Sequence, residues 1–432
     1  MTKYTRLIAW AALAMAVLPA ACSQVASGEP KAVAFSVFGD PAEFQAYQSL
    51  VAAFEEAHDD IDIVLSHIPS QSDYRARLAT DFAAGAPPDV SLHNFRRYAS
   101  FAAEGVLEPL GPYLDESELI AAEDFYPITL KVFTWQDMLM CIPQNISSLV
   151  VYYNADLFDA AGVAYPADDW TWDDFLATAQ ALTLDTDGDG QTDQFGLGTD
   201  ASFFRLAPFI WQNEGELVDD PARPTRLIVT RPPALAAFQW FVNLNQVHRV
   251  TPSRAEEAAQ DSESRFIAGT TAMYLNSRRG TPTYREIKSF TWDIAPLPRG
   301  KTAAGILHSD AYCLSAEAPN RDAAWTFIEF ANSAEGQAIV AASGRTVPSL
   351  IEVAESPAFL DPNEAPGRAR VFLDTVDVLR AVPIISTWQD IEVTAGMEVE
   401  RAFYGDISVD EAANLAVERT LEYFLIAQYA GR

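Results

Sequence analysis

The fold is decided by residues 32–65, AVAFSVFGDPAEFQAYQSLVAAFEEAHDDIDIVL, in which strand-like and helix-like patterns alternate. Residues 32–38 form an apolar run, and Gly39-Asp40-Pro41 interrupts it with a turn signal. Apolar residues then recur at helical spacing, and residues 61–65 alternate as a strand does. The stretch therefore predicts a strand, a helix and a second strand.

The same alternation continues to residue 92. Residues 74–84 have a helical pattern that ends at Gly85, and residues 89–92 form another short apolar run. Strands joined by helices in this way are parallel neighbours in one sheet. Further along, Thr171 and Asp174 have the spacing of a helix N-terminal capping box. We expect an α/β protein.

The first residues, MTKYTRLIAWAALAMAVLPAACSQ, have the pattern of an export signal. A basic start is followed by an apolar run over residues 7–18 and small residues before Cys22, and this run is shorter than the roughly 20 residues of a membrane span. Cys22 resembles the acylated cysteine of bacterial lipoproteins, although Pro19 stands where that motif usually has Leu. We expect residues 1–21 to be a signal peptide and Cys22 to carry lipid; the alternative is an ordinary secreted protein cut near Ala21.

Charge limits the classes of partner. The chain has 60 acidic and 29 basic residues, a net charge of −31, and removal of residues 1–21 deletes two basic residues to give −33. Such a field opposes phosphate binding, so a nucleic-acid partner is not expected. Hydrophobic residues make up 49% of the 432-residue chain, which suits a large core and two or three domains.

Several phrases of the sequence occur in the order typical of one protein family. They are PDV (88–90) with FAAEGVLEPL (101–110), IP (142–143) with LVVYYNADLF (149–158) and AG (161–162), WTWDDF (170–175), and FIAG (266–269) with AMY (272–274). In this order they resemble the extracellular solute-binding proteins of ABC importers, in the sugar-binding family that includes maltose-binding protein. The similarity extends over nearly the whole mature chain.

This resemblance implies a type II periplasmic-binding fold, with two α/β lobes hinged by crossing strands around a ligand cleft. The lobes implied are residues 32–142 with 313–365 and residues 143–312 with 366–432, after a lipidated linker at 22–31. The function implied is binding of a carbohydrate, expected to be an oligosaccharide, by a monomer in the periplasm or cell envelope. The sugar would be delivered to ABC permease subunits, and the membrane would be contacted through the lipid alone.

Two cysteines besides Cys22 remain. Cys141 and Cys313 both lie in apolar, strand-like surroundings, and the resemblance would place them on neighbouring crossing strands. In an oxidising compartment they can form a disulfide, whereas a free buried cysteine is also an ordinary core residue. The sequence leaves both alternatives open.

The segment DTDGDGQTD at 185–193 resembles the start of a calcium loop. Carboxylates fall at loop positions 1, 3, 5 and 9 and Gly190 at position 6, but Gly196 stands at position 12 in place of the usual Glu. We expect a structural Ca²⁺ site, with a metal-free acidic turn as the alternative. Its expected ligands are Asp185, Asp187, Asp189, Gln191 and Asp193.

A sugar site needs aromatic side chains that stack on the faces of the sugar rings. It also needs amide, carboxylate or guanidinium groups that form hydrogen bonds with the hydroxyl groups at the ring edges. Loops where the family places its ligand contacts supply such residues. The expected ligand-binding set is Phe38, Asp40, His93, Asn94, Arg96, Trp135, Asn145, Trp211, Tyr274, Asn276, Arg279, His308, Asp310 and Trp388. Arg96, Arg97, Arg278 and Arg279 would favour an acidic sugar, or equally form solvated surface.

The five histidines have no metal-ligand spacing, and no nucleophile or phosphate-loop motif is present. We therefore expect no catalytic residues and no enzyme activity. Two alternatives stay open: a secreted calcium-stabilised carbohydrate hydrolase, and a binder of the same fold for another solute, such as glycerol phosphate or a polyamine.

The lipid anchor can be tested in cells. Cys22→Ala removes the only expected acylation site, so the protein should move from the membrane fraction to the soluble envelope fraction. Immunoblots of the two fractions measure this, and an unchanged distribution would contradict the anchor.

Overall fold

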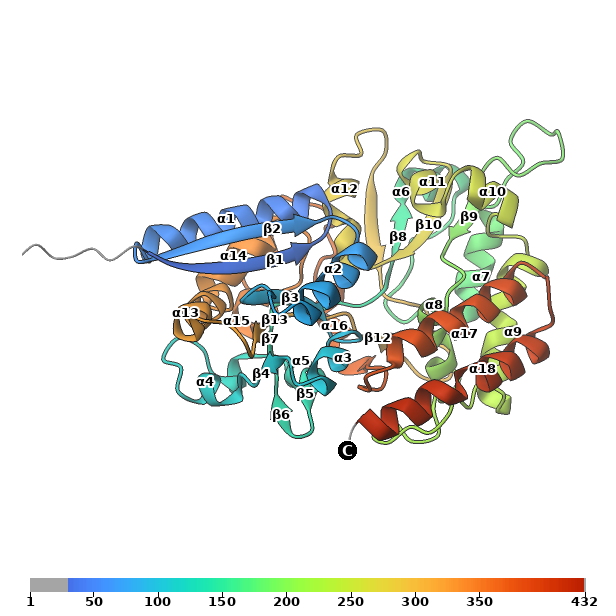
Figure 1. Ribbon diagram of the computed structural model, residues 1–432. Coiled ribbons are helices and arrows are strands. Elements are labelled where there is room, and N and C mark those ends of the chain that lie inside the picture. Colours follow the sequence, from blue (N-terminus) through green and yellow to red (C-terminus); the bar gives the residue numbers. More distant parts are fainter. Residues whose placement is uncertain (1–29, 431–432) are drawn as a thin grey trace, which may run out of the picture.

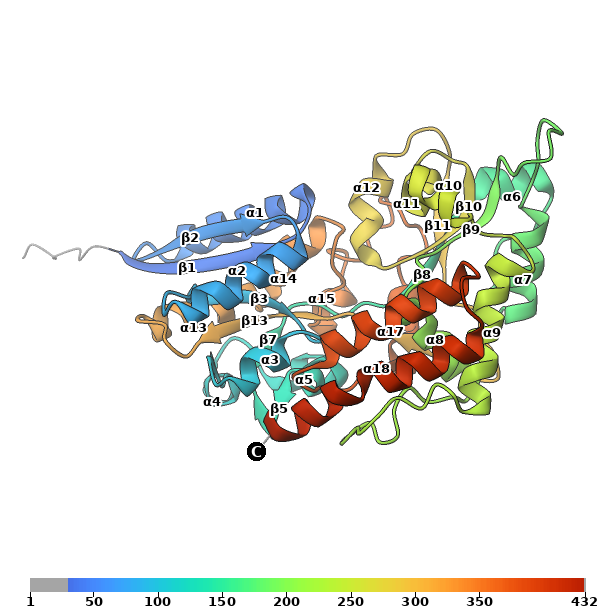
Figure 2. The same ribbon diagram turned by 45° about the vertical axis from the view of Figure 1, so that its right-hand side comes forward.

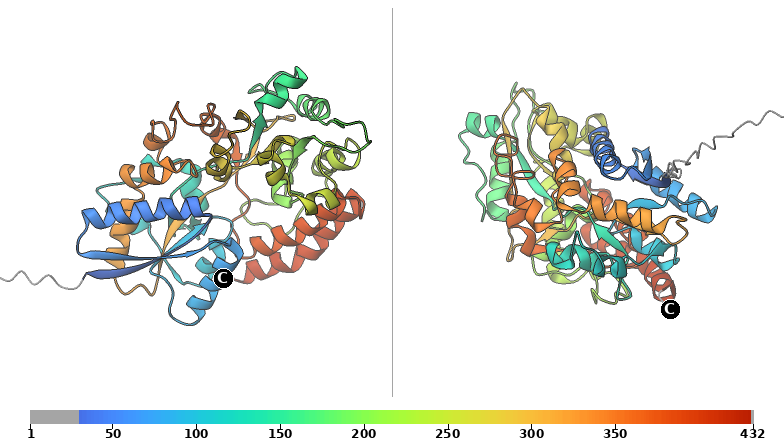
Figure 3. Two further views of the ribbon diagram at one scale, coloured as in Figure 1. Left: turned by 90° about the horizontal axis from the view of Figure 1, so that it is seen from above. Right: turned by 90° about the vertical axis from the view of Figure 1, so that its left-hand side faces the viewer.

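The computed structural model describes residues 30–430, so the expected signal peptide and Cys22 lie outside the described residues. The chain forms two lobes, each built on its own sheet, which lie side by side in Figures 1 and 3. None of the helices between residues 30 and 430 combines the length and apolar character that a membrane crossing requires.

The first lobe is built on a six-stranded sheet with the order β2-β1-β3-β13-β4, and β7 also pairs with β13. β1 is parallel to β2 and β3, as the opening sequence predicts, whereas β13 runs antiparallel to its partners. The strands are β1 (Lys31–Phe38), β2 (Ile61–Ile68), β3 (Val90–Asn94), β4 (Leu107–Glu108), β7 (Cys141–Pro143) and β13 (Asp310–Ser315).

Helices cover this sheet, and a small hairpin extends from it (Figure 1). These elements are α1 (Pro41–Ala57), α2 (Gln71–Ala83), α3 (Tyr98–Ala103), α4 (Gly111–Asp115), η1 (Ala122–Asp124), α5 (Pro127–Val132), α13 (Arg321–Ala331), α14 (Ala334–Ala342), α15 (Ile351–Ala354) and the hairpin β5 (Thr134–Trp135) with β6 (Met138–Leu139). α1 begins where Asp40 accepts a hydrogen bond from the Glu43 amide at 3.0 Å. It buries Tyr47, Leu50 and Phe54 against the sheet.

The second lobe has a four-stranded sheet with the order β11-β8-β10-β9. Its strands are β8 (Val150–Asn154), β9 (Phe195–Gly198), β10 (Thr271–Asn276) and β11 (Trp292–Ala295). Its helices are α6 (Ala155–Ala161), α7 (Trp172–Ala181), α8 (Phe203–Gln212), α9 (Pro232–Gln246), α10 (Arg254–Ala259), α11 (Ser262–Ile267), η2 (Arg278–Gly280) and α12 (Thr281–Arg285). The predicted capping box is confirmed, since Thr171 and Asp174 bond reciprocally at the start of α7.

The C-terminal part of the chain packs largely on the second lobe. α17 (Trp388–Phe403) and α18 (Val409–Ala430) form a helical pair against α8 and α9 (Figure 2). The remaining elements are β12 (Gly305–Ile306), which pairs with β14 (Leu379–Arg380), and α16 (Val371–Asp374) with η3 (Val376–Val378).

Two segments carry the chain between the sheets. Residues 144–149 lead from β7 to β8, and residues 296–309 lead back from β11 to β13. The expected two-lobe α/β architecture is therefore confirmed, while the residue limits given for each lobe stay a prediction.

The cysteine question is resolved in favour of the disulfide. Cys141 and Cys313 are register partners on the antiparallel strands β7 and β13, with Cα atoms 4.5 Å apart, and their sulfurs are bonded. Both are fully buried, and the bond joins residues separated by 172 positions at the point where the crossing segments leave the first lobe.

Candidate functional site

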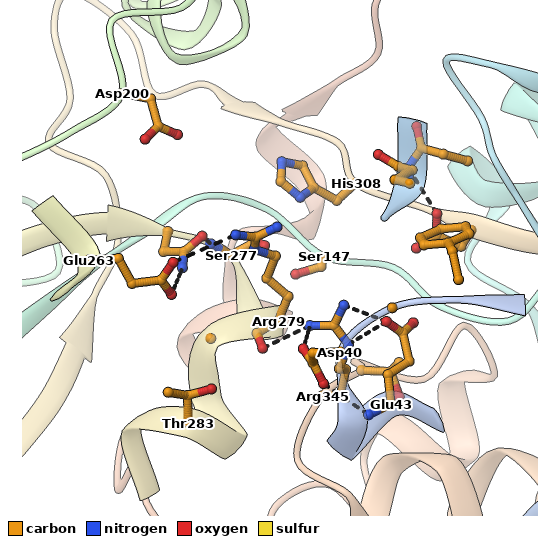
Figure 4. Close-up of a pocket in the computed structure, with 18 of the residues that line it drawn as sticks. Asp40, Glu43, Ser147, Asp200, Glu263, Ser277, Arg279, Thr283, His308 and Arg345 are labelled. Atoms are coloured by element: carbon orange, nitrogen blue, oxygen red, sulfur yellow. Dashed lines mark hydrogen bonds and ion pairs between the residues drawn. The ribbon is translucent and has the colours of Figure 1, made fainter. Parts of the chain in front are cut away.

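A cleft with a volume of about 930 Å³ lies between the two lobes. In the first lobe its wall includes the carboxyl ends of β1 and β3, where parallel strands commonly present binding groups. In the second lobe it includes the start of α8, α11 and the residues after β10. Figure 4 shows the lining side chains facing one another across this space.

One edge of the cleft is held by a guanidinium that contacts both lobes. Arg345 donates to Glu43 Oε2 through Nε at 2.7 Å and Nη2 at 2.5 Å, and its Nη1 lies 3.0 Å from Asp40 Oδ2. The same Nη1 donates to the backbone carbonyl of Arg279 in the second lobe at 2.9 Å. Burial raises the pKa of Glu43 to about 7, although Arg345 opposes the shift.

A second buried carboxylate, Asp310, lies on the cleft floor at the start of β13. It accepts hydrogen bonds from Asn94 Nδ2 at 2.9 Å and from Asn145 Nδ2 at 3.3 Å. Burial raises the pKa of Asp310, and the two amide hydrogen bonds oppose this rise. The three side chains form a hydrogen-bonded set at the junction of β3, β13 and the first crossing segment.

The two crossing segments are paired to each other beneath the cleft. Ser147 and His308 exchange two backbone hydrogen bonds, each 2.8 Å long. The His308 ring packs against Phe204 at 4.7 Å between centroids. Burial, together with nearby guanidinium groups, holds the pKa of His308 well below its usual range, so this imidazole is neutral.

Another set of charges joins the lobes beside the cleft. Glu392 of α17 accepts from Arg96 Nη1 at 2.6 Å and from Arg97 Nη2 at 2.9 Å. Arg96 also lies 4.0 Å above the ring of Phe204. Burial alone would raise the pKa of Glu392, but the two guanidinium charges outweigh it and the pKa is lowered.

The second-lobe wall is also made of paired polar groups. Arg205 forms an ion pair with Asp200 at 2.9 Å, and Glu263 accepts from Asn276 at 3.2 Å. Arg279 lies 3.7 Å from the second oxygen of Glu263 and is more than half exposed. The cleft therefore presents fixed hydrogen-bonding groups from both lobes.

Comparison with known families agrees with this architecture. The family model described as bacterial extracellular solute-binding protein matches residues 39–338. The chain belongs to this family. A putative binding protein of Brucella abortus is 22% identical to this solute-binding protein. The alignment covers 83% of this chain and 85% of the Brucella protein. The maltotriose-binding protein of Pyrococcus abyssi is also 22% identical. That alignment covers 73% of this chain and 66% of the Pyrococcus protein.

Solved structures with the same fold include two carbohydrate complexes. The ABC substrate-binding protein Lmo0181 from Listeria monocytogenes, in complex with cycloalternan, has a TM-score of 0.84 and 22% identity over 92% of this solute-binding protein and 99% of its own chain. Maltose-bound MalE3 of T. maritima has a TM-score of 0.77 and 21% identity. The match covers 91% of this chain and 99% of the MalE3 chain.

The structure brings together nine of the fourteen residues expected at the site of this solute-binding protein. Those that line the cleft are Phe38, Asp40, Asn94, Arg96, Asn145, Asn276, Arg279, His308 and Asp310. They come from both lobes and the crossing segments. Their contact with a ligand stays a prediction.

The expected tryptophan and tyrosine contacts need correction. Trp211 and Trp388 are 3% and 1% exposed, with Arg380 lying over Trp211 and Phe203 beside Trp388. Tyr274 is 3% exposed and stacks on Phe266. None of the three lines the cleft, because their large apolar faces are used in the second-lobe core.

His93 and Trp135 are also placed elsewhere. His93 is buried inside the first sheet, where it bonds Ser91 Oγ at 2.9 Å and packs on Phe101. Adjacent strand residues point to opposite faces, so Asn94 reaches the cleft region while His93 does not. Trp135 lies in the β5–β6 hairpin and is not a lining residue.

Several cleft residues were missed by sequence reasoning. Glu43, Ser147, Phe204, Arg205 and Glu263 line the cleft, and so does Arg345. Long-range contacts bring them there, for example the Arg345–Glu43 pair across 302 positions. A local signal existed for Glu43 alone, because it follows the helix cap at Asp40.

Most of the arginines that were expected to favour an acidic sugar contact other groups of the protein instead. Arg96 and Arg97 share Glu392, and Arg278 is 1% exposed with its guanidinium 4.9 Å from the ring of Phe359. Arg279 remains at the cleft wall.

The expected calcium loop brings only part of its ligand set together. Asp185, Asp187 and Asp193 place carboxylate oxygens within 4.8 Å of one another, and all three are exposed. Asp189 is not part of this group; it accepts from the Gln191 amide at 2.7 Å. A Cβ on Gly196 would lie 1.9 Å from the Ala179 carbonyl oxygen, so no side-chain ligand fits at position 12. The three carboxylates suit Ca²⁺ only if water completes the coordination.

Glu43 should make stability depend on pH. Its pKa is about 7 in the folded protein against a usual 4.5, so the native state holds the proton over that range. The stabilisation is present below the unfolded pKa and is lost as pH rises through about 7. Glu43→Gln stays neutral, so its unfolding free energy relative to the wild type should rise as pH increases from about 5 to about 8. Denaturant titrations across this range measure the difference, and parallel curves for the two proteins would contradict it.

Proposed function

We propose that this protein binds a carbohydrate in the interlobe cleft and delivers it to the permease of an ABC importer. The observation that carries the proposal is a cleft lined from both lobes and from the two crossing segments by fixed hydrogen-bonding groups. Sugars present hydroxyl rims that match such groups. Relatives whose names record maltotriose, maltose or cycloalternan support the carbohydrate class.

A ligand in this position contacts both lobes at once. The closed state then has contacts that the open state lacks, so binding shifts the equilibrium toward closure. Closure provides the permease with a shape that differs between the loaded and the empty protein. We propose no chemical conversion of the sugar, because binding and release are sufficient for delivery.

We further propose that the mature protein is a monomer held at the cell envelope by lipid on Cys22. The extracellular family supports a location outside the cytoplasm. The pattern of residues 1–22 supports export and acylation.

Binding can be separated from hydrolysis in one experiment. Purified mature protein incubated with a sugar library should melt at a higher temperature with at least one sugar, because a ligand that binds only the folded state stabilises it. At about 100 times the Kd the gain is roughly 2.7 kcal/mol. Chromatography of the same mixtures should return the sugar unchanged. Cleavage would contradict the proposal, and so would a melting temperature unmoved by every sugar.

The loop at residues 185–193 is proposed to hold a structural Ca²⁺ through Asp185, Asp187 and Asp193. EDTA should then lower the melting temperature, and added Ca²⁺ should restore it. Asp187→Ala should abolish that sensitivity, while Asp189→Ala is the matched control because Asp189 is outside the carboxylate group. A wild-type melting curve unaffected by EDTA would show that the loop is only a turn.

A further inference from the structure

We propose that Glu392 forms an interlobe latch with Arg96 and Arg97, a charged contact that holds the two lobes together beside the cleft and breaks when they separate. The latch lies within the protein, so it goes beyond the proposed function and does not depend on which ligand the cleft takes. Its effect is to favour the arrangement of the lobes described above over one in which they stand apart.

The partners of the latch come from different lobes. Arg96 and Arg97 directly follow β3 in the first lobe, whereas Glu392 lies in α17, which packs on α8 and α9 of the second lobe. Figures 1 and 2 place the start of α17 beside the first-lobe helix α3. Glu392 Oε1 accepts from Arg96 Nη1 at 2.6 Å and from Arg97 Nη2 at 2.9 Å. One carboxylate oxygen is therefore shared by two guanidinium groups across the boundary between the lobes.

The latch lies on the cleft side of the crossing segments. Arg96 lines the cleft from the first lobe and Phe204 lines it from the second, and the Arg96 guanidinium lies 4.0 Å from the centre of the Phe204 ring. A separation of the lobes that widens the cleft moves these two walls apart. It therefore breaks this contact and the ion pairs with Glu392 together.

The latch residues are held by contacts inside their own lobes. The backbone amide and Nε of Arg96 both donate to Asn94 Oδ1 at 3.2 Å. Glu392 lies in the second turn of α17, and the start of that helix is tied to α18 by a 2.8 Å hydrogen bond from Thr387 Oγ1 to the Tyr423 carbonyl. Side chains fixed in this way cannot follow one another when the lobes move, so separation breaks the ion pairs instead of stretching them.

The electrostatic attraction acts across the boundary between the lobes. Burial would raise the pKa of Glu392, but Arg96 and Arg97 outweigh it, so the carboxylate is ionised at neutral pH. Arg75 of α2 is a third guanidinium on the first-lobe side, and burial together with repulsion from Arg96 lowers its pKa. Positive charge from the first lobe is thus balanced by a carboxylate of the second lobe.

The latch is incompletely satisfied, which makes it reversible. Glu392 Oε2 and both Nε and Nη1 of Arg97 are buried and have no hydrogen-bond partner within residues 30–430. Burying such atoms unpaired costs free energy. Water reaches these atoms when the lobes separate, so opening recovers part of the free energy that is lost with the ion pairs. The latch therefore holds the lobes without locking them.

The same helix supplies a matched control. Glu398 of α17 is fully buried and also pairs with two arginines, Arg401 at 2.7 Å and Arg419 at 2.5 Å. Arg401 lies in α17 and Arg419 in α18, so both pairs stay inside the helical pair that packs on the second lobe. Glu392 and Glu398 thus differ in whether their arginines belong to the opposite lobe.

Small-angle X-ray scattering of the purified protein without added sugar tests the latch with these two glutamates. Glu392→Gln keeps the size of the side chain but removes its charge, so the radius of gyration should rise above that of the wild type. Loss of one charge-assisted hydrogen bond shifts the ratio of joined to separated lobes by about ten-fold or more. Glu398→Gln should keep the wild-type radius of gyration, whatever its effect on the melting temperature.

Arg97→Gln is a second variant, because Arg97 does not line the cleft and its loss leaves Glu392 paired with Arg96. Its radius of gyration should also rise, but by less than that of Glu392→Gln. Melting curves identify the variants that are folded, and Arg97→Gln decides the test if Glu392→Gln does not fold. A wild-type radius of gyration in the folded latch variants would overturn the proposal. An equal rise in Glu398→Gln would also overturn it, because general loosening of α17 would then explain the change.

Discussion

The pairing of the two crossing segments is the constraint on which the rest of the structure depends. Ser147 and His308 exchange backbone hydrogen bonds, and just beyond them Asn145 donates to Asp310. The disulfide between Cys141 and Cys313 fixes the same two chain segments inside the first sheet. The crossing segments are thus fixed to the first sheet at their first-lobe ends.

The buried charged groups at the cleft are held in pairs or by hydrogen bonds. Buried charges are stable only when they are paired or hydrogen-bonded, and here each has a partner. Glu43 has Arg345, Glu392 has Arg96 and Arg97, and Asp310 has two amides. Two of these sets reach across the lobes, through Arg345 to the Arg279 carbonyl and through Arg96 and Arg97 to Glu392.

The local parts of the fold could be predicted from the sequence. The β-α-β opening, the cap of α7 and the polar cleft residues after β1 and β3 follow from patterns within a few residues. The tryptophans could not be assigned in this way, because Trp211 and Trp388 fit a core and a sugar site equally well by residue type. Their place depends on packing against distant elements.

Ion pairs between residues far apart in the sequence could not be predicted either. Nothing near Glu43 in the sequence indicates that Arg345 will contact it, and nothing near Arg96 indicates that Glu392 will do so. The unpartnered Ser147 hydroxyl is visible only once the crossing segments are brought together. Sequence reasoning therefore identified the type of cleft but expected an aromatic lining that the fold uses elsewhere.

The central claim is that a sugar bound between the lobes closes them. Small-angle X-ray scattering of the mature protein, with and without a saturating concentration of its tightest-binding sugar, measures this directly. We expect the radius of gyration to fall when the sugar is added and to return when it is dialysed away. An unchanged radius of gyration, with calorimetry showing the cleft to be saturated, would contradict the account.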